Sequence, residues 1–352
     1  MIDTYLLLKL LIAFTGSLFF IGLLIRNAHR IGLVDIPNHR SIHQVITPRG
    51  AGIGMIGGIM LSDIVLLNDL VFSHIAAFLA IFMVFAVGIL DDHRDTSPRT
   101  KFFVIFAGVG LMWTDGIAIT TLGNYFGYEA ALGWAALPFT MFAVAGFTNA
   151  LNLSDGLDGL AGSLSIVILA ALALIGYQHD DAFIVTMALS FIAAIAAFLV
   201  FNWNPAKIFM GDSGSLTLGF VISLLAIKAL DYIEPASILL LAAIPILDTV
   251  VVMIRRKRSG KSMFSPDKLH LHHILLNFFS GNVRRTVAFI AILQAFYSLV
   301  GEALSGYHYQ RYVLVFFALN VALLYLLLNA MIEQRSLIPK RSLNLLRRRK
   351  RR

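Results

Sequence analysis

The sequence predicts an all-α polytopic membrane protein with one domain and about eleven transmembrane helices. Of its 352 residues, 58% are hydrophobic and only 14% are charged. A helix needs about 20 apolar residues to cross a bilayer, and apolar runs near this length follow one another from Leu6 onward. No internal repeat or long soluble segment separates them. We therefore expect residues 1–332 to form one membrane domain and residues 333–352 a basic tail.

The expected spans follow in order along the chain. They cover residues 4–25, 51–68, 73–90, 101–114, 132–151, 163–177, 182–201, 214–230, 236–254, 286–304 and 311–332. The fourth and sixth are short, so the count could change by one. The first lacks a basic start and a small-residue cleavage motif, so we expect it to be retained as a span. Residues 115–131 hold β-branched and aromatic side chains around Leu122-Gly123-Asn124 and could form a small hairpin.

The basic residues predict the orientation, because short loops rich in Lys and Arg stay in the cytoplasm. They gather in alternate loops, for example at Arg49, Arg94 and Lys207, and in the run 347–352, whereas the opposite loops carry acids. The N-terminus is therefore expected outside, the C-terminus in the cytoplasm and the hairpin in the periplasm. This placement explains the net charge of +8 without a nucleic-acid partner. The absence of cysteine excludes disulfides and thiolate metal sites.

Polar motifs are concentrated in the expected cytoplasmic loops. After the third span, GILDDHRDTSPRTKF carries adjacent Asp91 and Asp92 and then Lys101. Neighbouring carboxylates repel one another unless a cation or a shared proton relieves them. A solvated loop pair is the simpler interpretation, but the pair lies at the membrane edge, on the same side as the other acidic motifs.

The segment NALNLSDGLDGL, after the fifth span, contains the densest set of acids and amides. Asn152, Asp155 and Asp158 recur at a spacing of three, which brings successive members close together on a helical turn. Gly156 and Gly159 allow a ligand to approach the backbone closely. Oxygen ligands of this kind suit Mg²⁺ or Mn²⁺ rather than zinc. Helix capping would explain one or two of these residues but hardly all of them.

The segment FNWNPAKIFMGDSGS, before the eighth span, contains Asn202, Phe209 and Asp212. Glycines and small hydroxyl residues that open a helix expose backbone N–H groups, which favours a phosphate there. GDSGS alone is a weak signal, since Ser and Asp are also ordinary N-caps. Because Asp212 faces the same compartment as the other acids, a phosphate bridged by a cation is the better interpretation.

The basic loop after the ninth span holds three histidines, His270, His272 and His273. They could bind a sugar or pyrophosphate, or act as acid or base near neutral pH; zinc is an alternative, although no H-E-x-x-H motif accompanies them. The first cytoplasmic loop adds Arg40 and His43. A role in setting the orientation of the protein in the membrane would be enough to explain them. Asp248 could orient nearby groups. Asp63 has no role that the sequence reveals.

Five of these segments, in order and on one expected membrane face, resemble the polyprenyl-phosphate N-acetylhexosamine-1-phosphate transferase family. They read VDIPNHRSIHQVITPRG, LDDHRD, NALNLSDGLDGL, NPAKIFMGDSGS and FSPDKLHLHH. The resemblance therefore covers most of the chain. The form of FSPDKLHLHH is similar to the branch that uses UDP-GlcNAc rather than to the branch that uses UDP-MurNAc-pentapeptide.

The resemblance implies transfer of N-acetylglucosamine 1-phosphate from UDP-GlcNAc to undecaprenyl phosphate, with release of UMP and with Mg²⁺ or Mn²⁺ as cofactor. The product would initiate a cell-envelope polysaccharide of the O-antigen or enterobacterial-common-antigen type. The resemblance also implies a multi-pass protein of the bacterial inner membrane with a cytoplasmic active site. The UDP-sugar, undecaprenyl phosphate and the lipid bilayer are the expected partners, and a homodimer is left open.

The resemblance further assigns roles by matching position. It implies Asp212 as metal ligand, with Asn152 as a second. The catalytic set would be Asp91, Asp92, Asp155, Asp158, His270, His272 and His273. The substrate-binding set would be Lys101, Asn202, Phe209, Arg40 and His43. Lys101 departs from the arginine of some relatives in this branch but keeps the charge.

The chemistry of two anionic phosphates suggests a mechanism. A divalent cation, together with Lys and Arg, would lower the electrostatic part of the barrier. A lipid phosphate has a second pKa of about 6 and so is largely deprotonated already. We therefore prefer direct in-line attack on the β-phosphorus, with Asp91 positioning or deprotonating the lipid phosphate, over a covalent aspartyl intermediate. The lipid tail is expected in a groove near the ninth span, where Pro245 can kink the helix.

Three alternatives remain at this point. The same chemistry could use another UDP-N-acetylhexosamine. An ion-coupled transporter is a rival from another class, although transporters place their acids and broken helices near the membrane midplane. A zinc-dependent membrane hydrolase could use the histidine loop.

Overall fold

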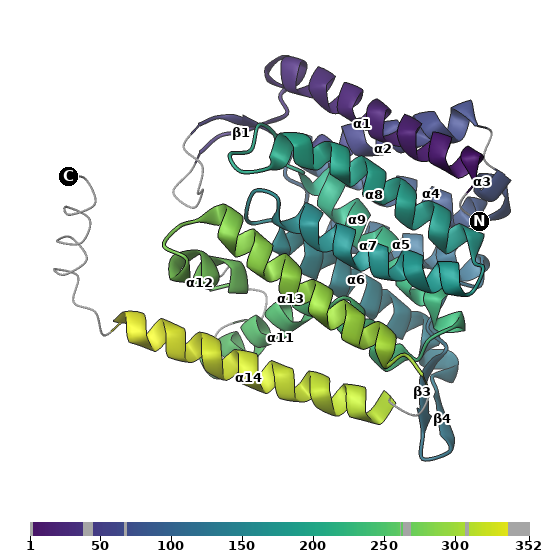
Figure 1. The fold of residues 1–352 in the computed structure, drawn as a ribbon, viewed down its shortest axis with the longest axis vertical. Helices are drawn as coiled ribbons and strands as arrows, with labels where there is room; N and C mark the ends of the chain where they lie inside the picture. Colours follow the sequence, from purple (N-terminus) through teal and green to yellow (C-terminus); the bar gives the residue numbers. More distant parts are fainter. Residues whose placement is uncertain are drawn as a thin grey trace.

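The computed structural model describes residues 3–37, 45–66, 69–260, 262, 269–306 and 310–336. These ranges form a helical bundle with two small two-stranded sheets (Figure 1). The helices are α1 (Thr4–Ile31), α2 (Ala51–Val65), α3 (Asp69–Ser73), α4 (Ile75–His93), α5 (Pro98–Thr114), α6 (Ala136–Ser154), α7 (Leu160–Gln178), α8 (Ala182–Asn202), α9 (Asp212–Lys228), α10 (Pro235–Leu241), α11 (Ala243–Arg258), α12 (Leu271–Phe278), α13 (Val283–Ala303) and α14 (Gln310–Ser336). The strands are β1 (Val34–Asp35), β2 (Thr47–Pro48), β3 (Thr121–Tyr125) and β4 (Tyr128–Ala131).

The helices confirm an all-α polytopic membrane protein. Within the described residues, eight helices are long and apolar enough to cross a bilayer, and the bent pair α10 and α11 makes nine if it counts as one span. Every expected stretch coincides with a helix or with this pair. The other two stretches form the shorter helices α2, with 15 residues, and α5, with 17. A total of eleven crossings therefore stays a prediction.

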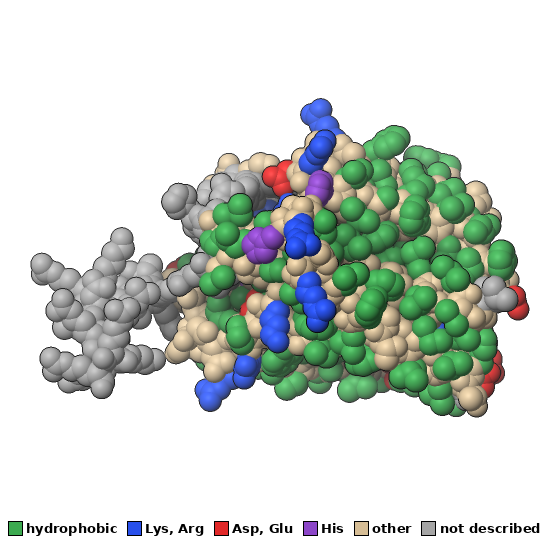
Figure 2. Space-filling view, turned by 90° about the horizontal axis from the view of Figure 1, so that it is seen from above, with side chains coloured by type: hydrophobic (Ala, Val, Ile, Leu, Met, Phe, Trp, Pro, Cys, Tyr) green, Lys and Arg blue, Asp and Glu red, His purple; other side chains and the backbone are tan. Residues whose placement is uncertain are grey.

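The bundle has two distinct ends. One end carries the start of α1 and the β3–β4 hairpin, and we call it the hairpin end; the other carries β1, β2 and α12, and we call it the α12 end (Figure 1). Lys and Arg side chains gather toward the α12 end of the face seen in Figure 2. A broad hydrophobic band follows, and acidic side chains lie at the hairpin end. This is the charge separation that the sequence pattern predicts.

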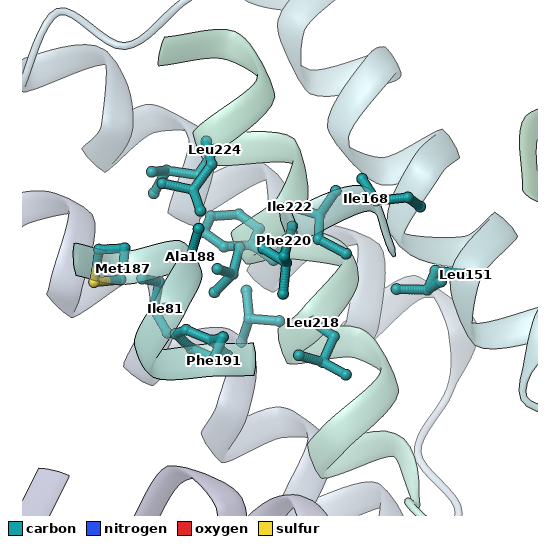
Figure 3. Close-up of a cluster of buried hydrophobic side chains, with 14 of the residues drawn as sticks. Ile81, Leu151, Ile168, Met187, Ala188, Phe191, Leu218, Phe220, Ile222 and Leu224 are labelled. Carbon is teal, nitrogen blue, oxygen red and sulfur yellow. The ribbon is translucent and has the colours of Figure 1, made fainter. Parts of the chain in front are cut away.

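Helix α9 runs through the centre of the bundle, and every residue from Ser213 to Ile227 is buried. Its neighbours approach closely because small residues face it. A Cβ on Gly88 of α4 would lie 2.6 Å from the Cα of Ser213, and one on Gly219 would lie 2.7 Å from the Cα of Thr148 in α6. Around Phe220, apolar side chains of α4, α6, α7 and α8 complete the core (Figure 3).

The break between α10 and α11 bends the pair by 90°. Pro245 cannot donate a backbone hydrogen bond, so the carbonyl of Leu241 loses its helical partner. Gln294 of α13 replaces it: its Nε2 donates to the Leu241 carbonyl at 2.8 Å, and its Oε1 accepts from the N–H of Ile244 at 2.9 Å. The hydroxyl of Ser298 donates a second hydrogen bond to the same carbonyl. The kink near Pro245 is thus confirmed, and its polar groups are satisfied as an apolar environment requires.

An ion pair inside the bundle accounts for Asp63. Its Oδ1 lies 2.6 Å from Nζ of Lys9, whose side chain is 1% exposed. An unpaired charge at this depth would be costly. The pair therefore joins α2 to α1 near the hairpin end.

The β3–β4 hairpin lies within residues 115–131, where the sequence predicts one. The strands pair antiparallel, with Tyr125 opposite Tyr128. Phe126 and Gly127 in the turn both have positive φ, as a two-residue hairpin turn requires. The periplasmic location of this hairpin stays a prediction.

Candidate active site

Asp92 lies at the end of α4 and holds the start of α9. Its Oδ1 accepts from the N–H of Asp212 at 2.8 Å and its Oδ2 from the N–H of Ser213 at 3.1 Å. The N–H groups of Gly214 and Ser215 donate to the carbonyl of Gly211. The expectation that this helix start presents free N–H groups to a phosphate is therefore wrong, because Asp92 and Gly211 occupy them.

Asp91, the neighbour of Asp92, contacts Thr96 and Lys101. Its Oδ1 accepts from the N–H and the hydroxyl of Thr96, each at 2.8 Å. Its Oδ2 lies 2.9 Å from Nζ of Lys101, which also contacts Oδ2 of Asp212 at 2.5 Å. Lys101 thus bridges two carboxylates that are 121 positions apart in the chain. The adjacent acids therefore have different surroundings, one facing Lys101 and one facing backbone.

Asn152, on the last turns of α6, completes the surroundings of Asp212. Its Nδ2 donates to Oδ1 of Asp212 at 3.0 Å and to the hydroxyl of Ser215 at 2.8 Å. Both oxygens of Asp212 are consequently fixed, one by an amide and one by an ammonium group. In this arrangement Asn152 holds Asp212 through its nitrogen, and its role as a metal ligand stays a prediction.

The loop between α6 and α7 places Asp155 and Asp158 differently. Burial, and then the negative charges of Asp212, Asp92 and Asp158, raise the pKa of Asp155 to about 7. Oδ2 of Asp158 accepts from Nδ2 of Asn204 at 2.8 Å and from the N–H of Ala206 at 3.0 Å. Asp155 therefore keeps its proton up to about pH 7, and Asp158 fixes the loop that precedes α9.

Asn202 and Phe209 flank that loop. Asn202 is buried: its Oδ1 accepts from the N–H of Gly159 at 2.7 Å, and its Nδ2 donates to the carbonyl of Ile208 at 2.8 Å. It therefore joins two loops of the site through the backbone. The N–H of Phe209 donates to the carbonyl of Pro48 in β2, and its half-buried ring is on the same side of the bundle.

The histidine loop is anchored by Asp248 of α11. Oδ2 of Asp248 lies 2.9 Å from Nδ1 of His270, and Oδ1 accepts from the N–H of Leu271 at 2.7 Å. The rings of His270 and His272 stack with centroids 5.8 Å apart, and His273 lies 4.2 Å from His272. Burial, and then the neighbouring His273, lower the pKa of His272 to about 3. His272 is therefore neutral at physiological pH.

His272 joins the histidine loop to the acidic loop. A Cβ on Gly156 would collide with Nε2 of His272, so this nitrogen lies directly against the backbone between Asp155 and Leu157. The structure thus brings most of the expected site residues together at the α12 end: Asp91, Asp92, Lys101, Asn152, Asp155, Asp158, Asn202, Asp212 and the three histidines. Arg40 and His43 lie outside the described residues.

Two contributors were not identified from the sequence. Thr96 anchors Asp91, and Arg284 donates from Nε and Nη2 to the carbonyl of Asn204 at 2.9 and 2.7 Å. Thr96 follows the acidic motif closely, so proximity could have found it. Arg284 lies in a basic loop where every arginine also fits an orientation role, so the sequence holds no signal that singles it out.

The oxygen donors of the site fit a divalent cation that binds partly through its substrate. Within the described part of the chain, no three His, Cys, Asp or Glu side chains form a metal-binding group. Mg²⁺ commonly takes one or two carboxylates and completes its shell with water and substrate phosphates. Asp212 is a carboxylate of this kind, and the pKa of Asp155, raised by burial and then by the negative charges of its neighbours, would fall if a cation offset those charges.

Known proteins with similar sequences identify the family. The profile of glycosyl transferase family 4 matches residues 74–230. A probable undecaprenyl-phosphate N-acetylglucosaminyl 1-phosphate transferase of Bacillus subtilis (strain 168) is 34% identical over 285 residues, 77% of this chain and 78% of its own length. The undecaprenyl-phosphate alpha-N-acetylglucosaminyl 1-phosphate transferase of Yersinia pestis is 33% identical over 311 residues, 84% of each chain.

The protein with the same name from Escherichia coli (strain K12) is 35% identical over 260 residues, 71% of this chain and 70% of its own length. The similarity therefore extends well beyond the region that the family profile covers, and it includes the acidic loops at the α12 end. The chain belongs to glycosyl transferase family 4, among its polyprenyl-phosphate N-acetylhexosamine-1-phosphate transferases.

Proposed function

We propose that this enzyme transfers N-acetylglucosamine 1-phosphate from UDP-GlcNAc to undecaprenyl phosphate and releases UMP. The observation that carries the proposal is the contact of Lys101 with both Asp91 and Asp212, beside the Asp155 loop. This arrangement combines a fixed cation with excess carboxylate, as expected where phosphates and a divalent cation meet. The names of the Yersinia pestis and Escherichia coli relatives support the choice of GlcNAc and of undecaprenyl phosphate.

Asp212 would hold Mg²⁺ or Mn²⁺, with Asn152 as the second expected ligand. When bound, such an ion offsets the negative charge of the pyrophosphate and lowers the electrostatic barrier to attack. Asp92 contributes by fixing the backbone that carries Asp212. Lys101 would turn from its carboxylate partners toward the incoming phosphates, which carry more charge.

The transfer itself would be a direct displacement. An oxygen of the lipid phosphate forms a bond to the β-phosphorus of the UDP-sugar, and the bond from that phosphorus to the bridging oxygen breaks, so that UMP leaves. Because the second pKa of a phosphate monoester is about 6, little proton removal is needed. Asp91, held by Thr96, would orient the lipid phosphate or take its residual proton. Radiolabelled sugar phosphate trapped on the protein without lipid would overturn this proposal in favour of a covalent intermediate.

The nucleotide would lie toward the loops that Asp158 and Asn202 fix. Phe209 is the expected stacking partner of the uracil, and His270, His272 and His273 the expected contacts of the sugar and pyrophosphate. Arg40 and His43 complete the expected substrate-binding set. Asp155, which interacts electrostatically with Asp212, would respond to the cation.

An apolar cavity of about 500 Å³ supports a lipid substrate. Its lining comes from β3, α6, α9, α10, α11 and α14, including Phe147, Ile222, Ile246 and Met253. The bend between α10 and α11 borders this cavity, in agreement with the expected groove near Pro245. An isoprenoid bound there would gain dispersion contacts with the apolar side chains that line the cavity.

The orientation follows from the two ends of the bundle. We place the basic α12 end in the cytoplasm, the hairpin end in the periplasm and the protein in the bacterial inner membrane, with α2 and α5 as short crossings that bring the total to eleven. Nine or eleven crossings both leave the two termini on opposite sides. The product would feed synthesis of a cell-envelope polysaccharide.

The decisive experiment incubates purified enzyme with a panel of labelled UDP-sugars, Mg²⁺ and undecaprenyl phosphate. UMP and lipid-linked product should appear with UDP-GlcNAc and require both lipid and metal. Product from another UDP-N-acetylhexosamine instead would reassign the sugar. No UMP from any of them would refute the proposed activity, and gradient-driven uptake into liposomes would then favour a transporter.

A further inference from the structure

Asp248 lies outside the acidic cluster, yet it contacts both His270 and Leu271. Its side chain is 6% exposed and both of its oxygens are engaged. One oxygen accepts from the N–H of Leu271 and so caps the first turn of α12. The other meets Nδ1 of His270, the residue that immediately precedes the helix. One carboxylate therefore fixes both the start of α12 and the ring next to it.

The contact with His270 also selects a tautomer. A carboxylate only accepts hydrogen bonds, so a neutral His270 must carry its proton on Nδ1 and present a lone pair at Nε2. Arg255 strengthens the same anchor, because its Nη2 donates to the carbonyl of Leu269 at 2.7 Å. The backbone on which His270 and His272 lie is thus fixed at both 269 and 271.

The anchored segment presents a polar atom without a partner. Nε2 of His272 is buried and has no hydrogen-bond partner among the described residues. It lies against Gly156 in the acidic loop. A buried polar atom without a partner destabilises the folded state, so a compensating hydrogen bond is expected when the site is occupied. An oxygen of the bound substrate in the loop would supply the missing partner.

The helix that carries Asp248, α11, also lines the apolar cavity. Ile246, Thr249, Val250 and Met253 of α11 line the cavity, whereas Asp248 is on another side of the same helix and faces α12. The helix after the break therefore contacts the proposed lipid tail on one side and the histidine loop on another.

We infer that Asp248 is a positioning residue of the transfer reaction, which acts through His270 and the start of α12 to aim Nε2 of His272 at the substrate in the Asp155 loop. This inference rests on the proposed function. It predicts that Asp248 affects the UDP-sugar, near which His272 lies, more than the lipid phosphate.

The test replaces Asp248 by Asn, which has the same shape but offers an N–H group to Nδ1 of His270. Loss of a carboxylate that orients a metal-ligating histidine commonly costs about 10- to 100-fold in activity, and we expect a fall of this order in kcat/KM for UDP-GlcNAc. The KM for undecaprenyl phosphate should stay within about twofold, because Asp248 does not line the cavity proposed for the lipid.

Asp181 offers a matched control. Its side chain is 7% exposed, its Oδ1 caps α8 through the N–H of Ile184 at 2.9 Å, and its Oδ2 accepts from the hydroxyl of Tyr232 at 2.9 Å. It is thus a buried capping carboxylate like Asp248, but at the hairpin end. Asp181→Asn should lower the melting temperature as Asp248→Asn does and leave kcat/KM unchanged.

A double-mutant cycle with His270→Gln separates positioning from a general loss of structure. If Asp248 acts through His270, Asp248→Asn should add little to the loss that His270→Gln causes. Full additivity, or wild-type kcat/KM in Asp248→Asn, would overturn the inference. If Asp248→Asn does not fold, Asp248→Glu keeps the charge, and the same selective loss for the UDP-sugar is expected there. An inactive wild-type enzyme would refute the proposed function instead.

Discussion

Oδ1 of Asp92 accepts a hydrogen bond from the backbone N–H of Asp212 at 2.8 Å. The second oxygen accepts from Ser213. In LDDHRD, therefore, the second acid holds the helix that presents the expected metal ligand, whereas the first faces Lys101. The two neighbours, which the sequence groups as one pair, act on the site in different ways.

Replacing Asp92 by Asn should harm both stability and metal use. The amide can accept from only one of the two N–H groups, and loss of a helix cap costs about 0.5 to 2 kcal/mol. Asp212 should shift with the helix start, so we expect a raised Mg²⁺ requirement and a fall in kcat. Thermal unfolding and a Mg²⁺ titration of UMP release measure the two effects. An unchanged Mg²⁺ requirement would contradict this role for Asp92.

A methyl group on Gly156 should disturb the site without changing its charge. It would collide with Nε2 of His272, and a displacement of about 1 Å near reacting groups can cost 100-fold in rate. We expect Gly156→Ala to be strongly impaired in UMP release. Gly110→Ala is the control, because nothing lies within 4 Å of its added methyl group. Equal activity of the two variants would show that this contact does not matter.

How much of this site the sequence predicts depends on the distance between partners along the chain. The apolar runs predict the helices because a span depends on local composition, and the acids stand out for the same reason. The partners do not: Lys101 meets Asp212, and Asp248 meets His270, only after the bundle has formed. GDSGS is a clear helix start in the sequence, but the occupation of its N–H groups by Asp92 depends on the packing of α4 against α9.

His272 should make the folded protein sensitive to acid. Its pKa is about 3 in the folded state and near 6.5 when unfolded, so below pH 6.5 the unfolded chain binds a proton that the folded chain excludes. Folding stability is then lost as pH falls from 6.5, by up to about 1.4 kcal/mol for each pH unit. The variant His272→Gln lacks this contribution. As the pH falls from 7 to 5, the melting temperature of the variant should therefore rise relative to that of the wild type.

The comparison of the wild type with His272→Gln is needed because Asp155 changes the stability with pH in the opposite direction. Its raised pKa means that the folded state keeps a proton that the unfolded state has released, so its contribution to stability is lost as pH rises toward 7. The wild-type profile contains both effects, whereas the difference between wild type and His272→Gln isolates the histidine. His179→Gln, which removes a histidine at the hairpin end, is the control. A pH-independent difference would contradict the buried neutral state of His272.

Asp155 should also make Mg²⁺ binding depend on pH. A cation near Asp212 competes with the proton that Asp155 holds up to a pH of about 7 in the metal-free protein. We expect the apparent Mg²⁺ affinity to rise between pH 6 and pH 8, because binding must release this proton. Asp155→Asn should flatten the profile. Mg²⁺-dependent shifts in melting temperature at several pH values measure it without any turnover.

The apolar cavity leads to the last prediction, which concerns the lipid substrate. Ala143 lines it from the middle of α6, so Ala143→Trp should fill part of the space that we propose for the isoprenoid. Excluding two methylene groups would forfeit about 1.6 kcal/mol, or roughly tenfold in affinity. The KM for undecaprenyl phosphate should rise by this factor while the KM for UDP-GlcNAc stays constant, because the proposed nucleotide site lies at the α12 end. Ala170→Trp, on an exposed position of α7, is the matched control for a large aromatic side chain in the bundle. If both variants keep the wild-type KM for the lipid, the tail binds elsewhere on the protein.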